Sequence, residues 1–171
     1  SSQKPESTLL RPDETLWVMR PTGGGAVLHG HDVTVGMAMP LTGSVRHAYR
    51  AVARPLIRAL NAVGVPAVLA EDTRVEHGGL HLPDCFASIS RNDIVDPASR
   101  LKRCGCALRR TRDAVLVQAS IPAGEPLLDA AEVIAGGVPV RGPAIDPRAF
   151  RDALEEAIAR LLEEDLVHSD R

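Results

Sequence analysis

The sequence predicts an α+β fold in which a mixed, mainly antiparallel sheet is flanked by helices. Apolar stretches with strand-like alternation occur in adjacent pairs, and stretches with helical periodicity stand between these pairs. This arrangement favours hairpin-type pairing over a doubly wound parallel sheet. At 171 residues, the chain has the length of one domain, and we expect residues 1–171 to form a single one.

Composition excludes several classes of protein. With 44% hydrophobic and 25% charged residues the chain is globular, and a net charge of −2 gives no overall attraction to nucleic acid or anionic membranes. Only four residues are aromatic, which disfavours binding of nucleic acid by base stacking. No apolar run approaches the roughly 20 residues of a membrane span, and no signal peptide is apparent. Three cysteines do not make a disulfide scaffold. We therefore expect a soluble cytoplasmic protein with neither a nucleic-acid nor a membrane partner.

The first elements in the chain are predicted to be strands. Short apolar runs cover Thr15 to Met19 and Gly25 to His29, on either side of a turn-forming segment from Pro21 to Gly24. The next run, Asp32 to Met39, alternates between larger apolar residues and smaller or polar ones. This order predicts a strand, a glycine loop and two further strands.

A helix is predicted from Ser44 to Val63, where apolar residues recur every three or four positions. Thr42 or Ser44 would cap its start, and Gly64 would end it. Because proline disrupts helical hydrogen bonding, Pro55 predicts a kink or two shorter helices.

The middle of the chain is predicted to contain short strands separated by a polar loop. Pro66 to Ala70 is strand-like, and Glu71 to Pro83 is polar and contains two glycines. Cys85 to Ile89 and Asn92 to Asp96 then predict a pair of strand segments.

The last third of the chain predicts a hairpin and two helices. Leu101 to Arg109 and Ala114 to Ile121 would pair through a charged turn, and a short helix would cover Pro126 to Ala135. The final helix is the clearest, with Asp146 as its cap and an apolar stripe that continues to about Leu166.

Two segments contain residues suited to chemistry. In Arg20 to His29 (RPTGGGAVLH), three glycines let a backbone approach a ligand closely, and a guanidinium beside exposed amides can bind an anion. A glycine-rich hairpin connection is the alternative interpretation. In the second segment, Lys102 is followed by small residues that leave room for a bound chain, although a lysine on a strand is usually a solvated surface charge.

Together these segments resemble the superfamily of lipoate-protein ligases, octanoyltransferases and biotin-protein ligases. Arg20 to His29 is similar to its arginine, triple-glycine and histidine motif, and Lys102 to Ala107 is similar to its lysine, x, x, glycine, x, alanine motif. Arg91 to Val95 resembles the arginine, asparagine and aspartate stretch that precedes the lysine, and Gln118 to Ile121 resembles the segment that follows it. The four matches occur in the family's order over about 100 residues.

The resemblance implies a biotin/lipoate protein ligase-like fold with an acyl chain held between the glycine loop and the lysine strand. It implies transfer of octanoate or lipoate to a lysine of a lipoyl domain or a glycine-cleavage H-type protein. Arg20 would meet the phosphate or carboxyl end of the substrate, and Lys102 would contact the reacting carbonyl. The other implied substrate-binding residues are Gly23, Gly24, Gly25, Ala26, His29, Asp93, Gly105 and Ala107.

The sequence also departs from the family's pattern. His29 is followed by Gly30 where many ligases have aspartate, and Ala119 stands where glycine is common. The family has further strands and a helix before a segment like the one that opens this chain. We therefore expect a catalytic-type domain that is N-terminally incomplete relative to the family.

One branch of the family suggests a nucleophile. Cys85 and Phe86 are similar to the cysteine–phenylalanine pair of octanoyltransferases that act through an acyl thioester, and Cys85 lies 17 positions before Lys102 (102 − 85). A thiolate near an ammonium has a lowered pKa and would attack an acyl carrier protein thioester. Alternatively, Cys85 is a small buried hydrophobic residue.

Two other functions remain open from the sequence. The first is an ATP-dependent ligase that forms an acyl-adenylate. It would need ATP and magnesium, and Asp93 would help to place the adenylate, whereas the transferase needs no cofactor. The second is a non-catalytic acyl-binding homologue. Transfer from a carrier is the preferred hypothesis.

The remaining two cysteines do not indicate a metal site, whereas a group of basic residues predicts a docking surface. Cys104 and Cys106 lie on one strand face without a second closely spaced pair, so no metal is expected. A basic cluster is expected to face an acidic partner domain, with a solvated strand pair as the alternative. Its members are Arg100, Lys102, Arg103, Arg109, Arg110 and Arg112.

Overall fold

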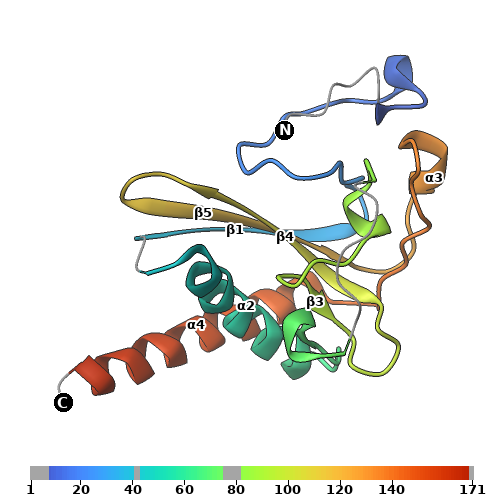
Figure 1. Ribbon diagram of the computed structural model, residues 1–171. Helices are drawn as coiled ribbons and strands as arrows, with labels where there is room; N and C mark the ends of the chain where they lie inside the picture. The colour runs from blue at the N-terminus through green and yellow to red at the C-terminus, as the bar shows by residue number, and fades with distance from the viewer. Residues whose placement is uncertain (1–7, 41–42, 75–81, 170–171) are drawn as a thin grey trace.

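The computed structural model describes residues 8–40, 43–74 and 82–169, with side chains to Glu164, and contains a five-stranded sheet covered by helices (Figure 1). The strand order is β1-β5-β4-β3-β2, and every neighbouring pair is antiparallel. This confirms the predicted fold class. The strands are β1 (Asp32–Pro40), β2 (Val68–Leu69), β3 (Ile94–Val95), β4 (Lys102–Arg110) and β5 (Ala114–Pro122).

Strand β5 lies between β1 and β4 and forms most of the sheet with them. It pairs with β1 along nine residues and with β4 from Gly105↔Ser120 to Arg110↔Val115. Because side chains alternate across a strand, each of these strands presents one row to the helices and one to the opposite face. Gly105 and Ser120 are direct cross-strand partners and lie on that opposite face.

Helices α2 (Val45–Ala62) and α4 (Pro147–Ser169) cover one face of the sheet, as Figure 1 shows. The predicted caps are present. Ser44 Oγ accepts a hydrogen bond from His47 N at 3.1 Å, and Asp146 Oδ1 accepts one from Arg148 N at 2.9 Å. Thr42, the alternative cap, lies outside the described residues.

The break predicted at Pro55 is wrong, because α2 is one continuous helix. Pro55 is buried, and so are Val52 and Leu56 around it. Burial of these side chains against the sheet and α4 stabilises the helix across the missing backbone donor.

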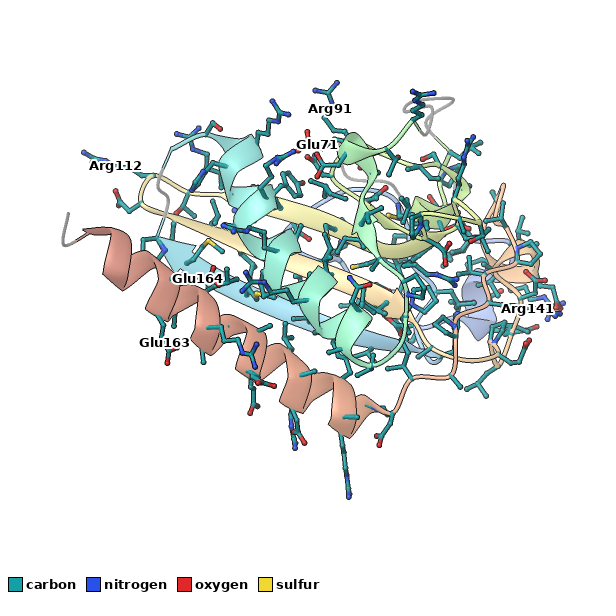
Figure 2. All side chains as sticks on the ribbon, turned by 90° about the horizontal axis from the view of Figure 1, so that it is seen from below. Glu71, Arg91, Arg112, Arg141, Glu163 and Glu164 are labelled. Carbon is teal, nitrogen blue, oxygen red and sulfur yellow. The ribbon has the colours of Figure 1, made fainter. Side chains whose placement is uncertain are left out.

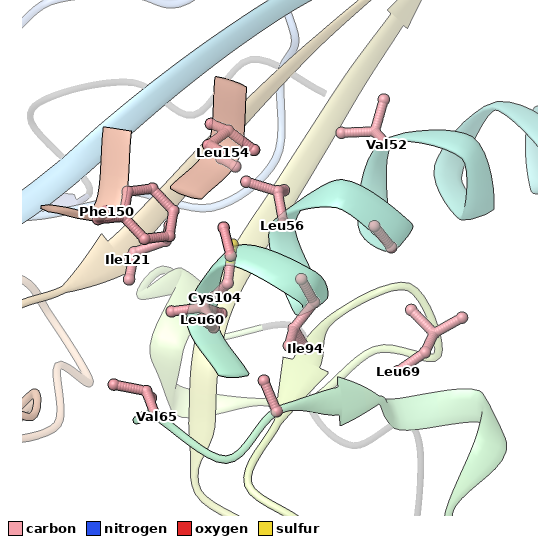
Figure 3. Packing of buried hydrophobic residues seen from close by; sticks show 14 of the residues in the cluster. Val52, Leu56, Leu60, Val65, Leu69, Ile94, Cys104, Ile121, Phe150 and Leu154 are labelled. Carbon is pink, nitrogen blue, oxygen red and sulfur yellow. The ribbon is translucent and has the colours of Figure 1, made fainter. Parts of the chain in front are cut away.

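The main core lies between the sheet and these two helices (Figure 3). Leu56 and Leu60 of α2 are fully buried, as are Cys104 of β4 and Phe150 of α4. Burying one such leucine or phenylalanine contributes about 1.5–3 kcal/mol. On the outer face of α4, the charged side chain of Glu163 points into solvent, whereas Glu164 lies on the side of α4 that faces α2 and forms an ion pair with Arg58 at 3.0 Å (Figure 2).

Three of the predicted strand segments are wrong. Thr15–Met19 forms no strand, and Gly25–His29 contains only the isolated bridge Ala26↔Asp84. Apolar residues of both segments line a cavity instead. In the third segment, Cys85–Ala87 is a 3₁₀ turn, capped by Asp84 Oδ1, which accepts a hydrogen bond from Phe86 N at 2.9 Å.

Some other predicted elements are shorter than expected. The strand at residues 66–70 is reduced to β2, and the helix at residues 126–135 is reduced to α3 (Ala130–Val133). Asp129 begins α3 by accepting a hydrogen bond from Ala131 N, so the preceding residues stay outside the helix. Residues 75–81 of the predicted polar loop lie outside the described part. None of the helices in the described ranges combines the length and low charge that a membrane span requires.

Candidate active site

A cavity of about 690 Å³ lies on the sheet face opposite α2 and α4. Its walls come from residues 14–20, the glycine loop, β4, β5 and the turn at Cys85. Apolar side chains such as Trp17, Leu28 and Ile134 supply much of the lining. The structure brings nine predicted site residues to this cavity: Arg20, Gly23, Gly24, Gly25, Ala26, His29, Cys85, Gly105 and Ala107. Lys102 and Asp93 lie beside it, in contact with Cys85 or with each other.

Backbone hydrogen bonds attach the glycine loop to the turn that carries Cys85. Ala26 N donates to Pro83 O at 2.7 Å, and Cys85 N donates to Ala26 O at 2.8 Å. A Cβ on Gly25 would lie 2.8 Å from Pro83 O and 3.0 Å from Cys85 N. Position 25 is therefore restricted to glycine by this close approach, which fixes the backbone around the thiol.

The Arg20 side chain folds back over its own loop. Its Nη2 donates to Gly25 O at 3.0 Å and its Nε to Thr22 Oγ1 at 3.2 Å, while Thr22 Oγ1 donates to Gln118 Oε1 at 2.9 Å. A Cβ on Gly24, whose φ is +89°, would lie 2.7 Å from Arg20 Nη2. The guanidinium thus ties the loop to β5, and its role toward a substrate anion stays a prediction.

Lys102 is held against Cys85 by a set of buried acceptors. Its Nζ donates to Asp93 Oδ2 at 2.8 Å, to Cys85 O at 2.7 Å and to Ser88 O at 3.3 Å, and lies 3.7 Å from Cys85 Sγ. The side chains of Lys102 and Asp93 are 5% and 3% exposed. Lys102 Nζ also lies 5.2 Å from the centroid of the Phe86 ring. All three ammonium hydrogens therefore have acceptors.

Gly105 gives Lys102 and Cys85 the space to meet. A Cβ at this position would lie 3.2 Å from Lys102 Cε and 3.5 Å from both Lys102 Nζ and Cys85 Sγ. The first distance is tighter than an ordinary van der Waals contact, so a side chain here would displace the lysine. The space that Lys102 and Cys85 occupy therefore explains why position 105, the glycine of the lysine motif, has no side chain.

The pKa of the Cys85 thiol differs in direction from the expectation. Burial raises the pKa of the Cys85 thiol; Lys102 opposes this effect, and Asp93 adds to it. The predicted lowered pKa is therefore wrong. For Lys102, burial lowers the pKa, but the Asp93 carboxylate and Cys85 outweigh it and the net direction is upward. The resting site thus holds a neutral thiol beside an ammonium.

A second polar network, which sequence reasoning missed, begins at His29. His29 Nδ1 lies 2.8 Å from Asp32 Oδ2, and Ser120 Oγ donates to the same oxygen at 2.7 Å. Gly30 N donates to Asp32 Oδ1 at 3.3 Å, and Thr34 Oγ1 donates to Asp32 Oδ2 at 3.1 Å. The spacing of Asp32 three residues after His29 was the only sequence signal. Ser120 is 88 residues away from Asp32.

The predicted basic cluster is divided by burial. Lys102 pairs with Asp93, and Arg103 Nη2 donates to Asp96 Oδ2 at 2.8 Å with its side chain 17% exposed. These two residues do not face a partner, and that part of the prediction is wrong. The exposed members are Arg100, Arg109, Arg110 and Arg112.

The Cys104 and Cys106 side chains lie on one face of β4, as predicted, with their Sγ atoms 3.8 Å apart. Cys104 belongs to the core beneath α2, and Cys106 packs against that core. Within the described ranges, no three His, Cys, Asp or Glu side chains gather in a way that could hold a metal ion.

Comparison with known proteins gives a consistent family. Residues 3–136 match the lipoyl protein ligase A/B catalytic domain. The octanoyltransferase LipM of Kyrpidia tusciae is 34% identical over 113 residues, which cover 61% of this chain and 40% of that protein. The LipM protein of Symbiobacterium thermophilum is 29% identical over 154 residues, covering 84% of this chain and 55% of the relative. The chain thus spans about half the length of the curated relatives it matches.

Solved structures show the same fold at lower identity. Protein Ta0514 of T. acidophilum, solved with bound lipoic acid, has a TM-score of 0.71 at 18% identity and covers 94% of this chain and 66% of that one. A bi-partite lipoate protein ligase from Thermoplasma acidophilum, described with its E2 lipoyl domain, has a TM-score of 0.65 at 17% identity, over 94% and 65% of the chains. A lipoate-protein ligase A bound with ATP has a TM-score of 0.68 at 19% identity, over 94% and 66%. With the matched residues containing the glycine loop, Cys85 and Lys102, this chain belongs to the lipoyl protein ligase A/B catalytic-domain family.

Proposed function

We propose that this protein transfers an octanoyl or lipoyl group from a carrier thioester to a lysine of a lipoyl domain, with Cys85 as the acyl-accepting nucleophile. The observation that carries the proposal is the position of Cys85 Sγ, 3.7 Å from Lys102 Nζ, at the wall of a largely apolar cavity. The similarity to octanoyltransferases supports the same reaction.

The cavity suits a medium-length acyl chain. Its volume of about 690 Å³ lies in the usual range of small-molecule sites. On the sheet side, Gly105 leaves space directly beside the thiol, and Ala107 lines the same cavity. Trp17 and Leu28 supply apolar surface, so the chain would lie between the glycine loop and β4 with its carbonyl at Cys85. Gly23, Gly24, Gly25, Ala26 and His29 are the other proposed substrate-binding residues.

In the first step, the Cys85 sulfur attacks the thioester carbonyl of the carrier. A carbon–sulfur bond forms to Cys85, the bond to the carrier thiol breaks, and the proton of Cys85 passes to the leaving thiol. Lys102 stabilises the negative charge that develops on the Cys85 sulfur as its proton leaves, because Asp93 holds the Lys102 ammonium beside that sulfur. Cys85 and Lys102 are therefore the proposed catalytic residues, with Asp93 as a positioning residue.

In the second step, the lysine amine of a lipoyl domain attacks the Cys85 thioester and releases the thiol. The reaction needs neither nucleotide nor metal, because the carrier thioester supplies the activated acyl group. An acyl carrier protein as donor and a lipoyl domain or H-type protein as acceptor complete the proposal. The unpaired Cys85 thiol fits a reducing compartment, and we place the reaction in the cytoplasm.

The proposal is tested by two separate assays, one with the octanoyl thioester of a carrier protein and one with the free acid. The protein is incubated with octanoyl carrier protein and a lipoyl domain without nucleotide, and acylation of the lipoyl domain is followed by mass spectrometry. We expect transfer under these conditions and no ATP–pyrophosphate exchange with free octanoate or lipoate. Exchange that depends on the free acid would identify a ligase instead, and failure of both assays, also in a chain extended at its N-terminus, would favour a non-catalytic acyl-binding protein.

A further inference from the structure

We propose that Asp84 is a positioning residue for the nucleophile of the proposed transfer reaction, on which this role rests. Its buried carboxylate joins the Cys85 turn to Val138 and thereby holds the Cys85 main chain where the thiol meets Lys102. Asp84 directly precedes Cys85 in the chain and is 2% exposed. It lies outside the lining of the substrate cavity, so it acts through Cys85 and not on the substrate.

Each oxygen of the Asp84 carboxylate accepts a backbone hydrogen bond, and the two donors belong to different segments. Asp84 Oδ1 accepts from Phe86 N at 2.9 Å, within the turn that contains Cys85. Asp84 Oδ2 accepts from Val138 N at 3.0 Å, in the segment that follows α3 and 54 positions away along the chain. One side chain therefore joins the turn of the nucleophile to a distant part of the fold.

The position of this turn decides where the thiol lies relative to Lys102. Asp84 forms an isolated bridge with Ala26, and Cys85 N donates to Ala26 O at 2.8 Å. Lys102 Nζ donates to Cys85 O at 2.7 Å and lies 3.7 Å from Cys85 Sγ. Because the backbone carbonyl and the sulfur of Cys85 both contact the same nitrogen, a shift of the turn would change both distances together.

A carboxylate suits position 84 because both of its partners are donors. An ionised aspartate accepts at both oxygens, whereas asparagine would accept at one and turn its amino group toward the other N–H. Solvent has little room to replace a lost acceptor. The enclosed cavity that Asp84 shares with His31 and Ser120 has a volume of about 10 Å³, which is space for about one water molecule. Loss of either acceptor would therefore leave a buried N–H without a partner.

Capping of the turn alone does not explain an aspartate here. Asparagine and aspartate are about equally good at the start of a helical turn, where the side chain accepts a single bond. Asp146 illustrates that simpler case, because the bond from Arg148 N at 2.9 Å begins α4 on the other side of the sheet. At position 84 the second bond, to Val138 N, makes the same exchange costly. The effect of Asp84→Asn therefore separates positioning from capping.

Transfer kinetics provide the first test. For folded Asp84→Asn we expect kcat to fall about 10–100-fold with the KM for octanoyl carrier protein within about threefold, because a displacement of about 1 Å can cost 10²-fold in rate. Val138→Pro removes the N–H donor of the same bond and should give a comparable loss. The double variant should be no slower than the slower single variant, since both changes break one bond. Asp146→Asn is the matched control and should keep both constants.

A proximity probe measures the thiol–amine geometry without substrate. o-Phthalaldehyde joins a thiol and a primary amine that lie close together into a fluorescent isoindole. The chain has two lysines, Lys4 and Lys102, so a Lys4→Arg background leaves one lysine side chain to react. We expect this protein to form the Cys85–Lys102 isoindole, identified by peptide mapping. Asp84→Asn in the same background should form it at least about tenfold more slowly at an equal folded fraction.

An unchanged rate of isoindole formation in Asp84→Asn would overturn the proposal, and so would losses in kcat that multiply in the double variant. If Asp84→Asn does not fold, Asp84→Ser replaces it with the same expectations, because serine keeps an acceptor for Phe86 N and has none for Val138 N. Isoindole formation that depends on Asp84 in a protein that transfers no acyl group would refute the proposed function and still support the positioning of the thiol by Asp84.

Discussion

The two faces of the central sheet are built from the same strands but serve different purposes. On β4, Cys104 belongs to the core beneath α2 and Cys106 packs against that core, whereas Gly105 and Ala107 line the cavity on the other side. The helix face is filled by large side chains such as Leu56 and Phe150. The cavity face is kept open by residues with little or no side chain.

Because side chains alternate along each strand, residues that stabilise the core and residues that shape the cavity lie on opposite faces of the same strands. Substitutions on the helix face should change the free energy of unfolding, whereas substitutions on the cavity face should change the transfer rate. Lys102 is the exception, because it is buried and also contacts the nucleophile.

The largest effect is expected for Lys102→Met. Loss of one preorganised donor should lower the transfer rate about 10²–10³-fold. It should also destabilise the fold by about 3–5 kcal/mol, because Asp93 would remain as an uncompensated buried charge. The double variant Lys102→Met/Asp93→Asn should recover stability in urea denaturation without recovering rate. Recovery of both quantities would show that Lys102 acts only through the fold.

On the helix face, Leu56→Ala should affect stability alone. Leu56 is fully buried in the core between α2, α4 and the sheet (Figure 3). Its truncation should cost about 2–5 kcal/mol, measured by urea denaturation. The transfer rate per folded molecule at low temperature should stay close to that of wild type. A fall in that rate comparable to the effect of Lys102→Met would contradict the division between the faces.

On the cavity face, Gly105→Ala should lower activity with little change in stability. The added methyl would lie 3.2 Å from Lys102 Cε and displace the ammonium from the sulfur, and we expect a transfer rate about 10–100-fold lower. Gly36→Ala is a matched control on β1, since a Cβ there meets no atom within 4 Å. Equal rates for the two variants would show that the space beside Cys85 is not used.

The smallest effect concerns the reactivity of the resting thiol. Burial and Asp93 raise the pKa of Cys85. The rate of its alkylation by iodoacetamide should therefore rise with pH, with a midpoint above that of an exposed thiol, whose pKa is about 8.5. Asp93→Asn should move the midpoint down and Lys102→Met should move it up. Peptide mapping isolates Cys85 from the other two cysteines. A midpoint below that of an exposed thiol would contradict the electrostatic account.

Much of the fold was predictable because the long elements carry their own periodicity. Strands β1, β4 and β5 alternate, and α4 has both its cap and its apolar stripe in sequence. The segments Thr15–Met19 and Gly25–His29 were predicted incorrectly because their apolar residues line a cavity instead of a sheet. Local pattern alone does not distinguish these two environments.

The site was predictable as a set of motifs but not as an electrostatic arrangement. The resemblance predicted that Cys85, Lys102 and the glycine loop lie close together, and in the structure Cys85 contacts both Lys102 and the loop. The direction of the Cys85 pKa depends on its burial and on Asp93, which sequence spacing does not reveal. The bond between Ser120 and Asp32 joins residues 88 positions apart and depends on the register of β5 with β1.

The central claim is that Cys85 carries the acyl group during turnover, and adduct mapping tests it most directly. The protein is mixed with octanoyl carrier protein, quenched in acid, digested and analysed by mass spectrometry. We predict one octanoyl group on the peptide that contains Cys85 and none in the Cys85→Ser variant, which should also fail to modify a lipoyl domain. An adduct confined to Cys104 or Cys106, or full transfer by Cys85→Ser, would contradict the account.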